Sequence, residues 1–363
     1  MINTTRIIVR ILAHLALLLF FGSAFGQTSD SISNMVGKPV AKDSLTAMVN
    51  TAMEQLKVAG ISMAVINDAK VVYHYHGGYA DLENKVPVNQ ETLFEAASLS
   101  KPMFAFFVMD YVEKGLLDLD KPLYEYLPYQ DIAHDERYKK ITARMVLSHT
   151  TGFPNWRNDY GKKELFIQFD PGSAFFYSGE GYQYLAKVLM RLSDTDDAGL
   201  EALFQKRFGK PLQLKHTRFV HQPHMLNNKA KGYAALKPKS GSDDINVFGA
   251  AFSIHSEALD FSKWLIALLK EEHLSTSSYE RLFETQVVLP EGHEQRQMGV
   301  TDWTLGFAKA ALPIGTAYGH GGNNFGYTSL FVVVPDSDWG LIIFTNDDQS
   351  QLPMAILQHL MQP

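Results

Sequence analysis

The pattern of apolar and polar positions predicts a sheet built from both ends of the chain. Two runs rich in β-branched and aromatic residues, 61–67 and 71–79, are separated by a short turn and predict an antiparallel hairpin. Two further runs, 328–334 and 340–345, flank a polar turn and predict a second pair of strands. We expect the strands from both ends to share one sheet.

A mainly helical region is predicted between these two strand-rich parts. Within this region, apolar residues recur at helical spacing over 103–114 and 182–192. Two further helices are predicted outside it, over 257–270 and 352–361. The stretch 102–249 is rich in helices and loops. We therefore predict a discontinuous α/β domain of residues 42–101 and 250–363, into which a mainly helical domain of residues 102–249 is inserted.

The first residues have the pattern of a secretory signal peptide. Arg6 and Arg10 precede an apolar run over 11–21, and small residues follow this run. The run is shorter than the roughly 20 apolar residues that a membrane-spanning helix needs. We predict a signal peptide of residues 1–26, cleavage after Gly26, and export to the periplasm or the medium without a stable membrane span.

Composition and charge exclude several classes of protein. The chain is 46% hydrophobic and 20% charged, which is typical of a globular protein. Its formal net charge of -6, with basic and acidic residues interspersed, makes nucleic acid an unfavourable partner. The absence of cysteine excludes disulfides, thiolate ligands and cysteine nucleophiles. His74 and His76 lack a third nearby ligand, and His293 lacks the second histidine of a zinc-protease helix, so we predict no metal and no cofactor.

A Ser-x-x-Lys sequence at the start of the first predicted helix carries the candidate chemistry. Ser98 and Lys101 are one helical turn apart, which places the hydroxyl and the amine on one face. At that distance the lysine can receive the serine proton and so activate the hydroxyl as a nucleophile. The alternative is a helix-capping serine followed by a surface lysine.

Segments that recur in order along nearly the whole chain give this motif its context. The chain resembles the serine β-lactamase and penicillin-binding-protein superfamily, and most closely its class C β-lactamase-like branch, in segments 58–65, 94–102, 147–152, 171–172, 177–178, 303–307 and 319–322. That branch contains D-aminopeptidases, D-Ala-D-Ala carboxypeptidases and carboxylesterases. The resemblance implies an α/β plus α fold: a mixed, mainly antiparallel sheet flanked by helices, with an inserted mainly helical domain and Ser98 at the junction.

The resemblance also implies catalytic roles, position by position. Ser98 corresponds to the acylated nucleophile and Lys101 to its proton partner. Tyr177 corresponds to the tyrosine of the second motif. In that role its phenolate, or its hydroxyl acting as a relay to Lys101, takes the serine proton and returns it to the leaving group.

The third motif is implied at His320, Gly321 and Gly322. Its glycines let a strand backbone approach the substrate, and its first side chain contacts the polar end of the substrate. The backbone N–H groups of the nucleophile and of Asn323 are implied as the oxyanion hole. His149 lies in a segment that the resemblance places near a loop, and we interpret it as a structural residue.

Two positions depart from the family pattern. Gly179 stands where relatives commonly have the asparagine of Tyr-x-Asn, so the amide that would contact Lys101 and an acylamino group is missing. Glu180 and Asn323 are the candidate substitutes, and the sequence alone does not show whether either one reaches the pocket. His320 stands where β-lactamases usually have lysine, which exchanges a permanent charge for one that is mostly absent above pH 7.

These features together predict an exported serine hydrolase that forms an acyl-enzyme at Ser98. Its partner is a small-molecule ester or a peptide, including peptides of D-amino acids. The alternatives are a β-lactamase and a catalytically silent module that binds cell-wall peptides. Because the neutral His320 adds little field to lower the pKa of Lys101 and Tyr177, we expect kcat/KM to keep rising between about pH 7 and 9.

Overall fold

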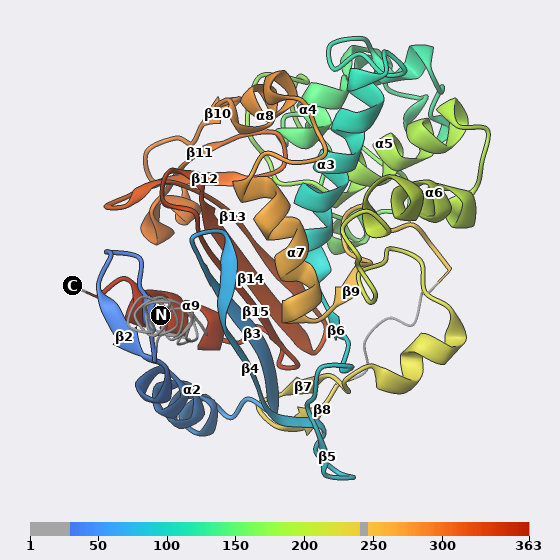
Figure 1. Ribbon diagram of the computed structural model, residues 1–363. Helices are drawn as coiled ribbons and strands as arrows, with labels where there is room; N and C mark the ends of the chain where they lie inside the picture. The colour runs from blue at the N-terminus through green and yellow to red at the C-terminus, as the bar shows by residue number, and fades with distance from the viewer. Residues whose placement is uncertain (1–29, 240–245, 363) are drawn as a thin grey trace, which may run out of the picture. The chain divides into compact units, whose positions relative to one another are not determined.

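The structure, a computed structural model, describes residues 30–239 and 246–362, and within them a nine-stranded sheet is the largest element (Figure 1). Its strands in spatial order are β10 (Val287–Val288), β11 (Val300–Trp303), β12 (Ala308–Leu312), β13 (Gly315–Asn324), β14 (Tyr327–Val334), β15 (Trp339–Thr345), β3 (Gly60–Asn67), β4 (Lys70–Asp81) and β5 (Val86–Pro87). Each neighbouring pair is antiparallel.

Helices pack on this sheet and extend beyond it. They are α2 (Lys42–Leu56), α3 (Ser100–Glu113), α4 (Ala143–Leu147), α5 (Gly179–Leu192), α6 (Asp197–Phe204), α7 (Ala258–Leu269), α8 (Thr276–Phe283) and α9 (Leu352–Leu360). Short strands outside the large sheet are β1 (Ser31–Ser33), β2 (Pro39–Ala41), β6 (Phe94–Glu95), β7 (Tyr233–Ala234), β8 (Lys237–Pro238) and β9 (His255–Ser256). The predicted fold class, a mainly antiparallel sheet flanked by helices, is confirmed.

The two ends of the sequence meet in the sheet as predicted. The hairpin of β3 and β4 pairs Met63 with Tyr75, and β14 pairs with β15. β15 then pairs with β3, with Leu341 opposite Val65. The C-terminal strands therefore lie beside the N-terminal hairpin, although most of the chain separates them.

Two cores lie on opposite faces of the sheet because side chains alternate along each strand. In β3, Ile61, Met63 and Val65 belong to a core shared with α2 and α9. Ala64 and Ile66 belong to a larger core shared with α3 and α7. Figure 1 shows these helix pairs on either side of the sheet.

Residues Ile32–Pro363 form one compact unit, and the division into an α/β and a helical domain stays a prediction. The predicted signal peptide lies outside the described residues. Among the residues described, no helix has the length and apolar character needed to cross a membrane.

Candidate active site

Ser98 lies in a tight turn that joins β6 to α3. The turn is a single 3-10 segment, Ala97–Leu99, and its first residue has a φ of +51°, a conformation that costs a non-glycine residue about 1–3 kcal/mol. Hydrogen bonds hold it in place. Ser100 Oγ donates to the Ala97 carbonyl at 2.7 Å and accepts from Ile254 N at 3.0 Å. The backbone before α3 is thus fixed to a neighbouring segment, with the half-buried Ser98 at the bend.

Lys101 lies directly against Ser98. Its Nζ donates to Ser98 Oγ at 3.1 Å and to the Ala251 carbonyl at 2.9 Å. The side chain is only 1% exposed, which excludes the alternative of a surface lysine. Burial lowers the pKa of Lys101 to about 7, because desolvation disfavours the charged amine. A large fraction of this lysine is therefore a neutral amine near pH 7, beside the serine hydroxyl.

Tyr177 completes the cluster from the segment just before the N-terminus of α5. It precedes Ser178, whose Oγ accepts from Gly181 N at 3.2 Å and caps the helix. The Tyr177 hydroxyl lies beside Ser98, and the Lys101 Nζ lies 4.6 Å from the centre of the Tyr177 ring. Burial raises the pKa of Tyr177 well above its ordinary value. The side chain is therefore a neutral phenol, which favours the relay and not the phenolate alternative.

His320 faces this cluster from β13. Its Nδ1 lies 2.6 Å from the Gly321 carbonyl, which only accepts, so Nδ1 carries the hydrogen and Nε2 has the lone pair. The Tyr177 hydroxyl lies 3.4 Å from that Nε2. Burial and the nearby Lys101 amine lower the pKa of His320 to about 3. His320 is accordingly an uncharged acceptor at neutral pH.

The two glycines of the third motif differ in their surroundings. A Cβ on Gly322 would lie 2.5 Å from the Ala96 carbonyl and closer still to Ser329 Oγ, so this strand approaches the Ser98 turn as only glycine permits. A Cβ on Gly321 would have no atom within 4 Å. Beyond Gly319, the described register of β13 with β12 ends. This part of β13 thus lies against the turn on one face and is open on the other.

Neither candidate substitute for the missing asparagine amide is bonded to Lys101, whose amine bonds to Ser98 and Ala251. The Asn323 amide nitrogen donates to the Tyr327 carbonyl and to Asp348 Oδ1, each at 3.1 Å. The Glu180 carboxylate accepts from the Arg157 Nε and Nη2, both at 2.8 Å. Both side chains are therefore bonded to polar partners other than Lys101. The oxyanion-hole role of the Asn323 backbone N–H stays a prediction.

His149 packs against the Tyr177 ring and is bonded to the backbone of Ser178. It is fully buried, its Nδ1 accepts from Ser178 N at 3.0 Å, and its ring centre lies 4.3 Å from that of Tyr177. Burial holds the pKa of His149 well below its ordinary value, so the ring is neutral. These contacts agree with the structural role that we expected for it.

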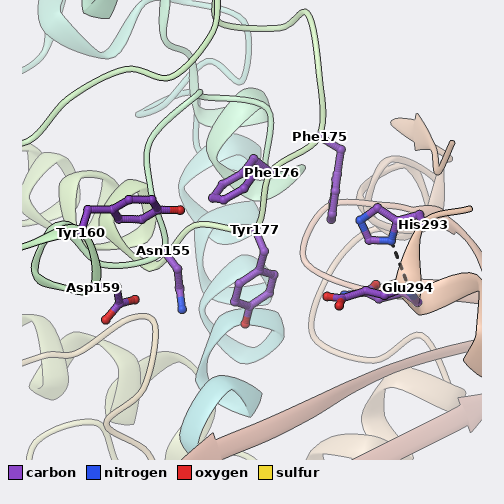
Figure 2. Close-up of a pocket in the computed structure, with 9 residues that line it drawn as sticks. Asn155, Asp159, Tyr160, Phe175, Phe176, Tyr177, His293 and Glu294 are labelled. Atoms are coloured by element: carbon purple, nitrogen blue, oxygen red, sulfur yellow. Dashed lines mark hydrogen bonds between the residues drawn. The ribbon is translucent and has the colours of Figure 1, made fainter.

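An open pocket of about 470 Å³ borders Tyr177 (Figure 2). Its walls come from the loop before α5, from the segment that leads into α5, and from the segment before β11. The lining residues are Asn155, Asp159, Tyr160, Phe175, Phe176, Tyr177, His293, Glu294 and Gln295. In the part of the chain that the structure describes, no group of three or more His, Cys, Asp or Glu side chains could hold a metal ion.

Sequence reasoning missed the loop of Asn155 and Trp156, which packs on Gly179. The Asn155 carbonyl accepts from Gly179 N and Glu180 N, both at 3.1 Å. Neither loop residue carries a spacing that would indicate this contact from the sequence. An unusual glycine two positions after Tyr177 was the available signal, since it implies that something else fills the space.

The fold and this Ser-Lys-Tyr cluster define the serine β-lactamase and penicillin-binding-protein superfamily. The sequence matches the family described as Beta-lactamase over residues 45–361, and the chain belongs to that family. It is 24% identical over 353 residues to Penicillin-binding protein 4* of Bacillus subtilis, covering 86% of this chain and 74% of that protein. It is 26% identical over 253 residues to a Beta-lactamase of Escherichia coli, covering 66% of this chain and 64% of that protein.

A solved structure shares the fold. The D-alanine Carboxypeptidase AmpC from Burkholderia cenocepacia superposes with a TM-score of 0.73 at 18% sequence identity, covering 88% of this chain and 97% of that one. The family match confirms the predicted superfamily, and this structure shows that the fold is shared. Membership of this family supports a serine hydrolase.

Proposed function

We propose that this chain is an exported serine hydrolase that cleaves an ester or a peptide through an acyl-enzyme on Ser98. The single observation that carries the proposal is the buried contact of 3.1 Å between Lys101 Nζ and Ser98 Oγ. A lysine that is neutral near pH 7 is a base of suitable strength for the serine proton. D-configured peptides belong to the proposed substrate range because relatives of this branch include D-amino-acid peptidases.

In the first step Ser98 Oγ attacks the substrate carbonyl and the neutral Lys101 amine takes the serine proton. The bond from Oγ to the carbonyl carbon forms, and the carbonyl oxygen becomes an oxyanion. The Ala251 carbonyl accepts from the same amine and holds it beside Ser98, where a turn of the neutral amine about its Cε–Nζ bond directs its lone pair at the hydroxyl. Backbone N–H groups of Ser98 and Asn323 are the proposed donors to the oxyanion.

Tyr177 is the proposed proton donor to the leaving group. Its protonated hydroxyl lies beside Ser98, close to where the bond to the leaving group would break. It gives its proton to the departing oxygen or nitrogen and regains one from the Lys101 ammonium. Water then attacks the acyl-enzyme with the same groups in reversed roles, which releases the acid and restores Ser98.

The neutral His320 favours an ester or a peptide over a β-lactam. An imidazole with a pKa of about 3 offers no positive charge to the carboxylate of a β-lactam at neutral pH. Its Nε2 instead accepts from the Tyr177 hydroxyl and holds that group in place. Export is supported by the charged and apolar pattern of residues 1–26 alone.

The proposal is tested by covalent labelling and by turnover. A fluorophosphonate probe should add one adduct to the wild-type protein by intact mass, and none to Ser98→Ala. The matched control is Ser277→Ala at an exposed position of α8, which should label like the wild type. The same proteins are assayed on p-nitrophenyl esters, D-Ala-D-Ala peptides, D-amino-acid amides and nitrocefin. A folded wild type that neither labels nor turns over any substrate would favour the peptide-binding module instead.

A further inference from the structure

The ring of Trp156, from another loop, fills the space beside Gly179, two residues after Tyr177. A Cβ on Gly179 would lie 2.6 Å from Cζ2 and 2.7 Å from Cη2 of Trp156. Real Cβ atoms do not approach carbon so closely, because van der Waals repulsion rises steeply there. The Trp156 indole therefore occupies the space into which any side chain at residue 179 would point.

The indole is held in place by bonds on both sides of it. Asn155 Oδ1 accepts from Gly179 N at 3.0 Å, in addition to the two bonds of the Asn155 carbonyl. On the other side, Arg157 donates to Glu180 from its backbone N at 3.0 Å and from its guanidinium, which also lies 3.0 Å from Asp131. The loop is thus fixed to the start of α5 immediately before and after the tryptophan.

Trp156 is paired with a second aromatic ring beside Lys101. The rings of Trp156 and Phe252 meet edge to face, with centres 5.7 Å apart. Phe252 directly follows Ala251, whose carbonyl accepts from Lys101 Nζ. Both rings are partly exposed. An apolar surface therefore flanks the cluster on the side of the base.

We propose that Trp156 and Phe252 form the wall that contacts the acyl group on Ser98, and that Trp156 selects aliphatic acyl chains over acylamino chains. This inference rests on the proposed function and names its acyl specificity. An aliphatic chain buries apolar area against the rings. An acylamino group placed there would leave its N–H without a partner, which is unfavourable.

The test compares esters that share one leaving group and differ in the acyl group: p-nitrophenyl acetate, p-nitrophenyl pentanoate and the p-nitrophenyl ester of N-acetylglycine. The last two have acyl chains of equal length. For Trp156→Ala we expect kcat/KM to fall at least about tenfold on the pentanoate ester. On the acetate ester, which has only one methyl group to bury against the wall, and on the N-acetylglycyl ester it should stay within about threefold. Trp156→Phe should retain most of the activity on pentanoate.

A double variant tests whether the indole is what excludes an amide. Gly179→Asn alone should lower activity on all three esters, because its Cβ meets the ring. Trp156→Ala combined with Gly179→Asn removes that clash and should raise kcat/KM on the N-acetylglycyl ester at least about tenfold over Trp156→Ala. Phe252→Leu tests the same wall from its other side and serves if Trp156→Ala does not fold by circular dichroism.

The outcomes separate this inference from the proposed function. Wild-type turnover that Ser98→Ala leaves unchanged would overturn the proposed function. Ser98-dependent turnover that Trp156→Ala lowers equally on acetate, pentanoate and N-acetylglycyl esters would overturn the acyl wall alone. An unchanged kcat/KM of Trp156→Ala on the pentanoate ester would also overturn the acyl wall.

Discussion

At the scale of single residues, Lys101 is the proposed base, and burying its amine is unfavourable for the stability of the fold. Its amine is removed from water and its pKa falls from 10.5 to about 7. Each pKa unit corresponds to about 1.4 kcal/mol between the two protonation states. The fold therefore holds this lysine at the expense of stability, which is a common trade-off at catalytic sites.

We predict that Lys101→Met abolishes turnover and raises the free energy of unfolding by about 1–3 kcal/mol near pH 7. Methionine has a similar length and needs no hydration, while the bonds to Ser98 and Ala251 are lost. The measurement is urea denaturation of both proteins. An equal or lower stability of the variant would contradict the cost assigned to this lysine.

The stability that Lys101→Met gains over the wild type should decrease as the pH rises. In the unfolded chain the lysine binds its proton up to about pH 10.5, whereas the folded protein releases it above about pH 7. Wild-type stability therefore rises with pH across this window, and the advantage of Lys101→Met shrinks. Ser98→Ala is the control, since it is equally inactive but keeps the amine and should keep the wild-type slope.

The rate should report the same ionisation. We predict that kcat/KM for p-nitrophenyl acetate rises through an inflection near pH 7 and is nearly constant above about pH 8, as Lys101 loses its proton. This expected profile differs from the one predicted from the sequence, in which kcat/KM keeps rising between about pH 7 and 9. The difference arises because burial lowers the pKa of Lys101 to about 7. Tyr177→Phe should leave the inflection in place, because Tyr177 stays protonated throughout, and should lower the plateau more on an alkyl ester than on p-nitrophenyl acetate, whose leaving group departs as an anion. A rise that continues through pH 9 would assign the base to another group.

At the scale of elements, the site depends on how closely β13 approaches the turn before α3. A Cβ on Gly322 would collide with the Ala96 carbonyl, whereas a Cβ on Gly321 would enter open space. Ser329 Oγ on β14 donates to that same carbonyl at 2.7 Å. Strand and turn are therefore locked together by contacts that involve no catalytic side chain.

We predict that Gly322→Ala lowers kcat/KM at least about tenfold and the free energy of unfolding by about 1–3 kcal/mol, since its methyl group pushes β13 from the turn. Gly321→Ala is the matched control, and its stability should stay within about 0.5 kcal/mol of wild type. Both are read by kinetics on p-nitrophenyl acetate and by urea denaturation. Equal stability of the two variants would show that the strand can yield at Gly322.

At the scale of the whole molecule, predictability follows the range of the interactions. Strong local periodicity predicted the β3–β4 hairpin, β14, β15 and the helices α3, α5, α7 and α9, whose patterns are decided within a few residues. Spacing within one helical turn likewise brought Ser98 and Lys101 together. Such features need no information from distant parts of the chain.

Long-range contacts were not predictable in the same way. Strands β11 and β12 are short and lack clear alternation, and β13 is rich in glycine, so their extended conformation depends on pairing with neighbours. The packing of Trp156 on Gly179 joins two loops that carry no mutual signal. Burial, which sets the pKa of Lys101 and His320, is also a property of the complete fold.

The two cores on opposite faces of the sheet separate stability from catalysis. The core of α2 and α9 contains the fully buried Ile356, while the cluster of Ser98, Lys101 and Tyr177 lies on the other face with α3. A cavity in the first core removes packing energy from the whole unit, because the sheet unfolds with both. It leaves the distances within the cluster unchanged as long as the protein is folded.

We therefore predict that Ile356→Ala lowers the free energy of unfolding by about 2–5 kcal/mol and leaves kcat/KM within about twofold of wild type at low temperature. The matched variant is Ala105→Gly in α3, a fully buried position whose methyl group packs near Gly306 on the catalytic side. It should cost less stability yet change kcat/KM more, because α3 carries Lys101. Kinetics and urea denaturation of both proteins give the comparison. Activity that falls with stability to the same degree in both variants would show that the two faces are not independent.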